Sequence, residues 1–171
     1  MVLQTNIPSI LIAPCGMNCG ICMAYLRKRN HCVGCNIESP QRAKHCSVCK
    51  IKNCTERPAG SQFCFDCKKY PCTRLKQLDK RYRTKYSMSM IENLNGIRDL
   101  GLDRFMEIEN TRWVCPKCGN PICVHNGRCY NCENVAWSSH RAKNTRLVLH
   151  EFPILNEKNL ILQKNYLLTS L

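Results

Sequence analysis

Acidic residues, aromatic residues and long apolar runs are scarce in this sequence. Among 171 residues only 12 are Asp or Glu, and aromatic residues make up 7%. So few carboxylates leave little material for the carboxylate pairs of acid–base enzymes. Few aromatics argue against a large conventional core. No window of 18 apolar residues occurs, which excludes a membrane-spanning helix.

The sequence also lacks the short motifs of common enzymes. Its eight glycines form neither a GxGxxG nor a GxxxxGK loop, and there is no HExxH and no serine elbow. The five histidines stand isolated from one another. We therefore predict a protein that is not an enzyme and takes no small-molecule substrate.

A secretory signal is missing from the start of the sequence as well. The apolar run at 7–13 is short, contains Pro8 and follows no basic residue. We therefore expect a cytoplasmic, reducing location, in which thiols remain free to bind metals.

Cysteine and positive charge are abundant. The chain has 16 cysteines and a formal net charge of +14. Twelve of the cysteines form CxxC pairs, whose turns direct two sulfurs at one point, the knuckle of tetrahedral thiolate sites. Spacing and compartment together favour metal ligands over disulfides. The pairs are Cys19/Cys22, Cys32/Cys35, Cys46/Cys49, Cys64/Cys67, Cys115/Cys118 and Cys129/Cys132.

Two of these pairs predict a zinc ribbon at 114–133. Cys115 and Cys118 are followed ten residues later by Cys129 and Cys132. Four protein ligands leave no open position for water, so the predicted ion is structural. Two residues inside the loop, Cys123 and His125, could replace a ligand or be buried bystanders; we favour the bystander role for His125 and leave Cys123 open.

The N-terminal cysteines are harder to group. A Cx₃Cx₂C run resembles the cluster motif of radical enzymes, but those need a large barrel that this chain cannot supply. A Cx₂Cx₄C pattern occurs twice, 18 residues apart. Because eleven cysteines do not divide by four, His31 or His45 could complete a third site, or one thiol could be free. Zinc and [4Fe–4S] clusters both suit these ligands. The predicted N-terminal ligands are Cys15, Cys19, Cys22, Cys32, Cys35, Cys49, Cys54, Cys64, Cys67 and Cys72, with Cys46 as a further candidate.

The expected fold class is a small metal-stapled protein, mostly α with irregular cysteine-rich loops. We divide it into an N-terminal module (1–73), a helical spacer (74–113), the short ribbon (114–133) and a C-terminal tail (134–171). Apolar spacing predicts short helix at 21–29 and a longer helix at 73–86, and a capping box at Ser89–Glu92 predicts the next, ending at Gly101. The apolar end of the tail is expected to fold back over 87–113 or to anchor in a partner.

The helix at 73–86 carries a concentration of positive charge. From 68 to 85 there are eight bases and one acid. A solvated face and an anion-binding or partner-binding face are about equally compatible with this pattern. The candidate binding residues are Arg74, Lys76, Lys80, Arg81, Arg83 and Lys85.

Several of these motifs resemble a known family. They are the run APCGMNCGICMAY at 13–25, CVGC at 32–35, the pair Cys49 and Cys54, FC at 63–64, and CKKYPC at 67–72. Together they resemble the cysteine-rich domain of unknown function 3795, which is widespread in anaerobic archaea and bacteria. Long members also carry a segment like RWVCPKCG at 112–119, so the resemblance extends over about 12–133. Cys46 lies outside the family pattern. The resemblance implies metal binding and leaves the activity open.

Two functions are compatible with this sequence. One is a redox- or oxygen-responsive metal-binding module that docks on a larger protein complex, since thiolates are oxidisable ligands and metal binding is coupled to folding. The other is an RNA- or ribosome-associated zinc-binding protein. We favour the first, because so many cysteines exceed what a simple scaffold needs.

Overall fold

The protein is mostly helical, with three longer helices packed against irregular cysteine-rich segments. The computed structural model describes residues 6–40 and 44–133. The longer helices are α3 (Thr73–Tyr86), α4 (Met90–Leu100) and α5 (Leu102–Arg112). Isolated β-bridges occur, but the described ranges contain no strand. In those ranges we find no helix with the length and apolarity needed to cross a membrane. The short elements are α1 (Met23–Leu26), α2 (Lys44–Ser47) and the 3-10 turns η1 (Ser9–Leu11), η2 (Cys19–Ile21) and η3 (Cys64–Asp66).

Helix α3 has the predicted bounds and the predicted apolar stripe. Leu75 is buried, and Leu78, Tyr82 and Tyr86 pack partly buried against the main core. The helix ends where Ser87 adopts a left-handed conformation with φ of 51°. All six candidate binding residues on this helix are exposed. The stripe therefore fixes which side of α3 faces solvent.

The single acid of α3 is buried rather than part of the charged face. The Asp79 carboxylate accepts hydrogen bonds from Ser89 Oγ (2.7 Å) and from the backbone N–H of Ile91 (3.1 Å). Arg83 Nε also donates to it, at 2.7 Å. Asp79 thus satisfies free donors at the start of α4 from the neighbouring helix.

Helix α4 follows the predicted boundaries. Ser89 Oγ accepts from the backbone N–H of Glu92 at 3.0 Å, as an N-cap should. Gly101, with φ of 81°, ends α4 and immediately precedes α5. Phe105 and Met106 of α5 are buried in the main core. The N-cap at Ser89 and the glycine stop are therefore confirmed.

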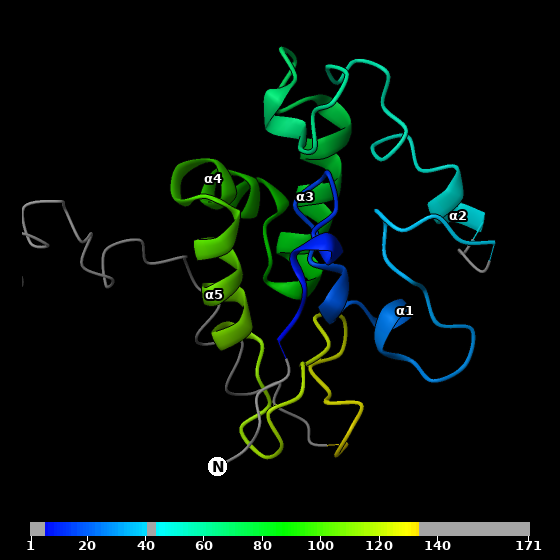
Figure 1. Cartoon of the computed structure of the whole chain (residues 1–171), viewed down its shortest axis with the longest axis vertical. Helices are drawn as coiled ribbons and strands as arrows, with labels where there is room; N and C mark the ends of the chain where they lie inside the picture. The colour runs from blue at the N-terminus through cyan, green and yellow to red at the C-terminus, as the bar shows by residue number, and fades with distance from the viewer. Residues whose placement is uncertain (1–5, 41–43, 134–171) are drawn as a thin grey trace, which may run out of the picture.

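The N-terminal segment runs alongside these helices and shares their core. Figure 1 shows it beside α3, with residues 114–133 at one end of the helices. The core joins Leu11, Ile12 and Ile21 to Leu94 and Phe105. One core thus connects the N-terminal cysteine-rich residues to the helices.

A tight turn brings the N-terminal segment onto α4. Gly16 has φ of 83°, and a Cβ placed on it would lie 2.6 Å from the carbonyl oxygen of Met90. The carbonyl of Gly16 accepts a hydrogen bond from Asn93 Nδ2 at 2.9 Å. Only glycine fits both the positive φ and the close approach.

The helix expected at 21–29 is shorter in the structure. Residues 19–21 form the 3-10 turn η2, and the α-helix extends only over Met23–Leu26. Arg27 is extended, with ψ of 144°, and the chain turns back so that Cys32 N–H donates to Ala24 O at 2.6 Å. This hydrogen bond between chain segments outweighs the local helical preference.

The predicted docking of the tail at 134–171 lies outside the described residues.

Candidate metal centre

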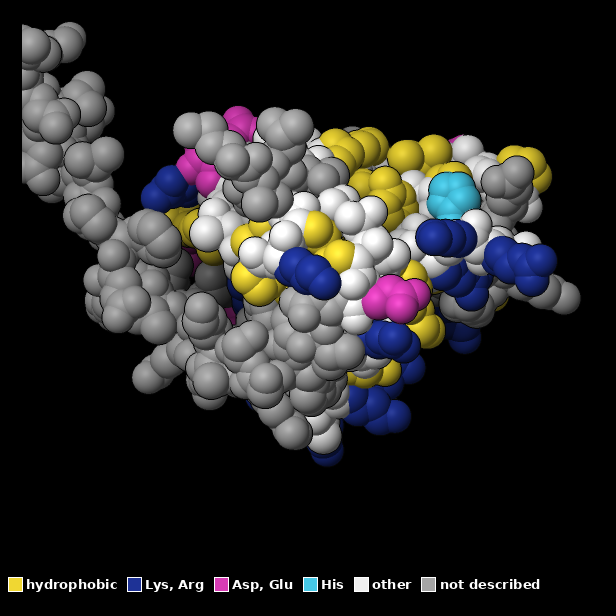
Figure 2. All heavy atoms as spheres, turned by 90° about the horizontal axis from the view of Figure 1, so that it is seen from below, with side chains coloured by type: hydrophobic (Ala, Val, Ile, Leu, Met, Phe, Trp, Pro, Cys, Tyr) yellow, Lys and Arg dark blue, Asp and Glu magenta, His cyan; other side chains and the backbone are white. Residues whose placement is uncertain are grey.

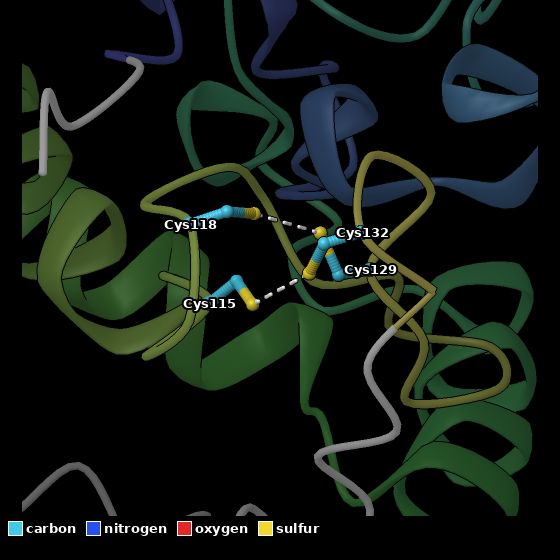
Figure 3. Close-up of side chains that lie close together, drawn as sticks. All are labelled: Cys115, Cys118, Cys129 and Cys132. Carbon is cyan, nitrogen blue, oxygen red and sulfur yellow. Dashed lines mark hydrogen bonds between the residues drawn. The ribbon is translucent and has the colours of Figure 1, made fainter.

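Four cysteine thiols meet in the ribbon, residues 114–133. Figure 3 shows Cys115 and Cys118 on one turn facing Cys129 and Cys132 on another. All four Sγ atoms lie within 4.8 Å of one another, so the group could hold a metal ion. Cys115 Sγ is 3.6 Å from Cys132 Sγ, and Cys118 Sγ is 3.4 Å from Cys129 Sγ. The structure therefore brings together the four ligands that the spacing predicted.

These sulfur distances fit a metal better than a disulfide. A disulfide needs a separation of about 2.05 Å. Zinc–sulfur bonds of about 2.3 Å place tetrahedral ligands roughly 3.8 Å apart. All 16 cysteines lie in the described ranges, and none of them forms a disulfide there. The arrangement therefore fits a metal ion held by the four sulfurs.

Backbone hydrogen bonds shape the two turns. Cys115 N–H donates to Asn120 O, and Gly119 N–H returns to Cys115 O, both at 2.8 Å. Gly119 has φ of 72°, which closes the turn. On the facing side, Ile122 pairs with Cys129 in an antiparallel bridge. The knuckles are thus held by local backbone geometry.

The environment of the four thiols is uneven. A backbone hydrogen bond from Asn120 is the main reason why the pKa of Cys118 falls to about 6. Burial raises the pKa of Cys129 to about 12. The thiolate form is thus favoured at Cys118 and the neutral thiol at Cys129. A cation bound to both sulfurs would deprotonate both.

The two other candidate ligands in the ribbon point elsewhere. Cys123 is fully buried, and its backbone donates to Arg128 O at 2.9 Å. His125 Nδ1 accepts from Met23 N–H at 3.2 Å, and its Nε2 lies 3.1 Å from the Tyr82 hydroxyl. Because Nδ1 is the acceptor, the neutral ring carries its proton on Nε2 and donates it to Tyr82. His125 thus joins the ribbon to α1 and α3.

A buried carboxylate links the ribbon to the N-terminal turn. Glu109, with no exposed surface, accepts from Asn18 Nδ2 at 3.0 Å and from Trp113 Nε1 at 3.3 Å. Arg112 Nη1 lies 3.5 Å from the same carboxylate. This role of Glu109 was not predicted from the sequence, although an acid on the apolar face of α5 indicates a buried carboxylate.

Most N-terminal cysteines gather near Cys35. Cys19 is hydrogen-bonded to Cys35, and this contact together with burial raises the pKa of Cys19. Burial, with like charge on Cys35 and other thiols, raises the pKa of Cys15 to about 12 and that of Cys46 to about 11. Burial is also the main cause of the raised pKa of Cys22. These buried thiols favour their neutral form unless a cation compensates them.

A different set of cysteines surrounds a small cavity. Cys54, Cys64, Cys67 and Cys72 line it together with basic side chains. Cys49 lies close enough to Cys15 to raise the pKa of Cys15 slightly, and Cys32 raises the pKa of Cys22 in the same way. The predicted N-terminal ligands are therefore divided between two neighbourhoods.

In the described part of the chain, no contact places either of the two remaining candidate histidines next to a group of cysteine sulfurs. His31 is exposed, and its ring lies edge-on to Tyr25 with centroids 6.4 Å apart. His45 belongs to α2, but its side chain lies outside the described part. The proposed completion of a third site by either histidine stays a prediction.

The described residues define a cysteine-rich, mostly helical protein with one four-thiol group that could hold a metal ion. Residues 11–77 match the model of the family described as Protein of unknown function (DUF3795). The resemblance predicted from the N-terminal motifs is thereby confirmed; its extension through the ribbon stays a prediction. No curated protein and no solved structure matches the chain.

Proposed function

We propose that this protein is a non-catalytic, multi-site metal-binding module that docks on a larger protein complex while its thiolates are reduced. The observation that carries the metal-binding part is the convergence of Cys115, Cys118, Cys129 and Cys132 within 4.8 Å. Four thiolates suit zinc, which is the occupant we propose for the ribbon. The site has a structural role, because no ligand position remains for a reactant.

Oxidation would change this site directly. Cys118 and Cys129, 3.4 Å apart, can lose two electrons to a peroxide. Two thiolates, one hydrogen peroxide and two protons then yield one disulfide and two waters, and the zinc ion is released. A disulfide draws the sulfurs closer than a tetrahedral ion allows, so the knuckles must rearrange.

Hydrogen bonds can transmit this rearrangement to the rest of the protein. Val124 N–H donates to Ile21 O at 2.9 Å, and His125 contacts Met23 and Tyr82. Loss of ribbon order would remove these contacts from α1 and α3. The docking surface that we propose to respond is the exposed side of α3.

The test uses the full chain purified without oxygen. We expect stoichiometric zinc at the ribbon and its loss in Cys118→Ser and Cys132→Ser, with Ser47→Ala as an exposed control. Peroxide should release the same zinc and abolish capture of the partner complex, and reduction with added zinc should restore both. Unchanged zinc in the two ribbon variants would refute the metal site. Zinc release without any effect on complex capture would refute redox-dependent docking.

A second candidate function is RNA or ribosome binding, favoured by the exposed bases of α3. Figure 2, seen from the end that carries the ribbon, shows Lys and Arg more widespread than Asp and Glu on the visible surface. Lys76, Lys80 and Lys85 are all exposed. Replacing these three by Ala should weaken RNA binding and reduce its salt dependence by up to about three ion equivalents. Unchanged RNA affinity at low salt would remove this candidate.

A further inference from the structure

A small cavity separates the turn that ends at Cys54 from the start of α3. Its volume is about 30 Å³, close to the space that one water molecule occupies in the liquid. Four cysteines line it: Cys54, Cys64, Cys67 and Cys72. Cys54 comes from one turn and the other three from the following stretch at 64–72, so the fold of this segment brings them to one cavity.

The backbone holds three of these cysteines in a fixed arrangement. Cys67 N–H donates to Cys64 O at 3.2 Å, and Tyr70 N–H donates to Cys67 O at 2.9 Å, which forms a knuckle. Cys72 is the N-cap of α3, and its carbonyl accepts from Lys76 N–H. A thiolate at a helix N-terminus is stabilised by the helix dipole. Cys64 N–H also donates to Pro14 O at 2.9 Å, which ties the knuckle to the family motif at the N-terminus.

The charges around the cavity complement a thiolate centre. Four thiolates with one divalent ion carry a net charge of about −2. The charged side chains that line the cavity are all basic: Lys50, Arg57, Lys69 and Arg74. Arg57 Nη2 donates to Lys52 O at 3.0 Å, and the Arg57 side chain lies against the Cys64 thiol, whose thiolate form it favours, while Nη1 is buried with no other partner in the described part of the chain. Unpaired buried donors are rare, so this one calls for an anionic partner.

The grouping differs from the one that the repeated sequence pattern suggests. The first Cx₂Cx₄C repeat would place Cys54 with Cys46 and Cys49. In the structure Cys54 lies at the cavity with the second repeat, whereas Cys46 lies near Cys32 and Cys35. Cys54 therefore supplies the fourth ligand that the second repeat lacks.

We propose that Cys54, Cys64, Cys67 and Cys72 form a second four-thiolate metal centre, separate from the ribbon and charge-balanced by the surrounding Lys and Arg side chains. The inference rests on the proposed metal-binding function and assigns its second site. In the described part of the chain, only the ribbon cysteines have all their sulfurs within 4.8 Å of one another. A single zinc ion would thus require the sulfurs to move closer together, whereas an iron–sulfur cluster suits a wider spacing. Both occupants use the same four thiolates.

Metal analysis of the full chain, purified without oxygen, tests the assignment. Cys64→Ser and Cys67→Ser should each lose one metal centre relative to the wild type. The double variant should lose no more than either single variant, because both residues serve one site. Cys118→Ser should lose a different centre, so that its loss adds to that of Cys64→Ser. Ser47→Ala, exposed at the end of α2, is the control and should keep the wild-type metal content.

The identity of the metal separates the two occupants. Loss of zinc alone indicates a single ion; loss of iron with inorganic sulfide and visible absorption indicates a cluster. Either result supports the centre. Unchanged metal in Cys64→Ser and Cys67→Ser, with zinc lost in Cys118→Ser, would overturn this centre and leave the ribbon site intact. Unchanged metal in all three variants would overturn the proposed function as well.

Differential alkylation of the wild type decides the question if the variants fail to fold. The four thiols should be protected together in the metal-loaded protein and become reactive together after chelation, while the ribbon thiols respond as their own set. Alkylation of any one of the four before chelation, with the other three protected, would overturn the grouping.

Discussion

The ribbon and the N-terminal cysteine-rich region differ in how much apolar side chain lies behind their thiols. The ribbon cluster consists of Ile122 surrounded by the cysteines themselves. The N-terminal region contributes Leu11, Ile12, Ile21 and Phe63 to the main core. Burying each such side chain contributes about 1.5–3 kcal/mol. We therefore expect bound metal to supply most of the folding free energy of the ribbon. Apolar burial should supply much of the folding free energy of the N-terminal region.

Metal removal should show the largest difference between the two regions. Structural zinc contributes on the order of 10 kcal/mol to small thiolate domains. After chelation under anoxia, the backbone N–H groups of Cys115, Ile122 and Cys123 should lose their protection from hydrogen exchange. Those of Leu94 and Ile97 in α4 should keep it. Hydrogen exchange followed by mass spectrometry measures both in one sample.

Readdition of zinc is the control for irreversible damage and should restore the ribbon protection. Persistent protection of residues 114–133 in metal-free protein would show that Ile122 and the local backbone hold the ribbon on their own. Equal loss of protection in α4 would remove the distinction between the regions.

A smaller effect is expected from Glu109, which connects the two regions. Glu109→Ala leaves the donors of Asn18 and Trp113 buried without their acceptor. Removing one partner of a buried charged network costs roughly 3–5 kcal/mol. Glu109→Gln keeps one acceptor oxygen and should lose less. Urea unfolding of the metal-loaded protein gives both values; equal stability of the Ala variant and the wild type would contradict the connection.

Gly16 tests the packing of the N-terminal turn by itself. Gly16→Ala forces a Cβ to within 2.6 Å of Met90 O at a φ of 83°, and we expect a loss on the order of 3 kcal/mol from strain and displacement. Gly60 also has a positive φ, of 79°, but has open space around it. Gly60→Ala is therefore the matched control for the backbone alone. Similar losses in the two variants would show that the close approach to α4 contributes nothing.

The smallest effect concerns His125 and depends on pH. Burial, together with the positive charge of Arg81, lowers the pKa of His125 below its ordinary value of 6.5. The unfolded chain then binds a proton more readily than the folded one. The contribution of His125 to the free energy of unfolding is present above about pH 6.5 and is lost as the pH falls through the pKa of the folded state.

Thermal melts between pH 5 and 8 measure this contribution. The wild type should lose more stability than His125→Gln as the pH falls, because only the histidine takes up a proton on unfolding. Identical pH profiles would assign the acid sensitivity to the thiols instead.

The sequence predicted the features that depend on local spacing. Helix α3 follows from its apolar stripe, α4 from Ser89 and Gly101, and the ribbon from two CxxC pairs. These signals act within one or two turns of chain, so no distant residue had to be known. The short α1 was missed because the Cys32 to Ala24 hydrogen bond arises from the return of the chain.

Features that join distant segments could not be predicted in this way. Cys54 and Cys72 line one cavity, and the knuckle between them is hydrogen-bonded to Pro14 in the N-terminal segment. Asp79 and Glu109 are buried acids on helices, and each also accepts a hydrogen bond from a distant residue, Asp79 from Ser89 and Glu109 from Asn18. Spacing identifies the ligand types, whereas tertiary packing decides which ligands share a centre.

The Asp79 contact has a consequence for any partner of α3. Because one carboxylate binds both Arg83 within α3 and the first turn of α4, sliding α3 by a single residue, about 1.5 Å, would break the contact. The positions of the Lys and Arg side chains along α3 are therefore set before any encounter. A partner would meet a preorganised row of charges and would not have to order the helix on binding, which leaves more of the interaction free energy for affinity.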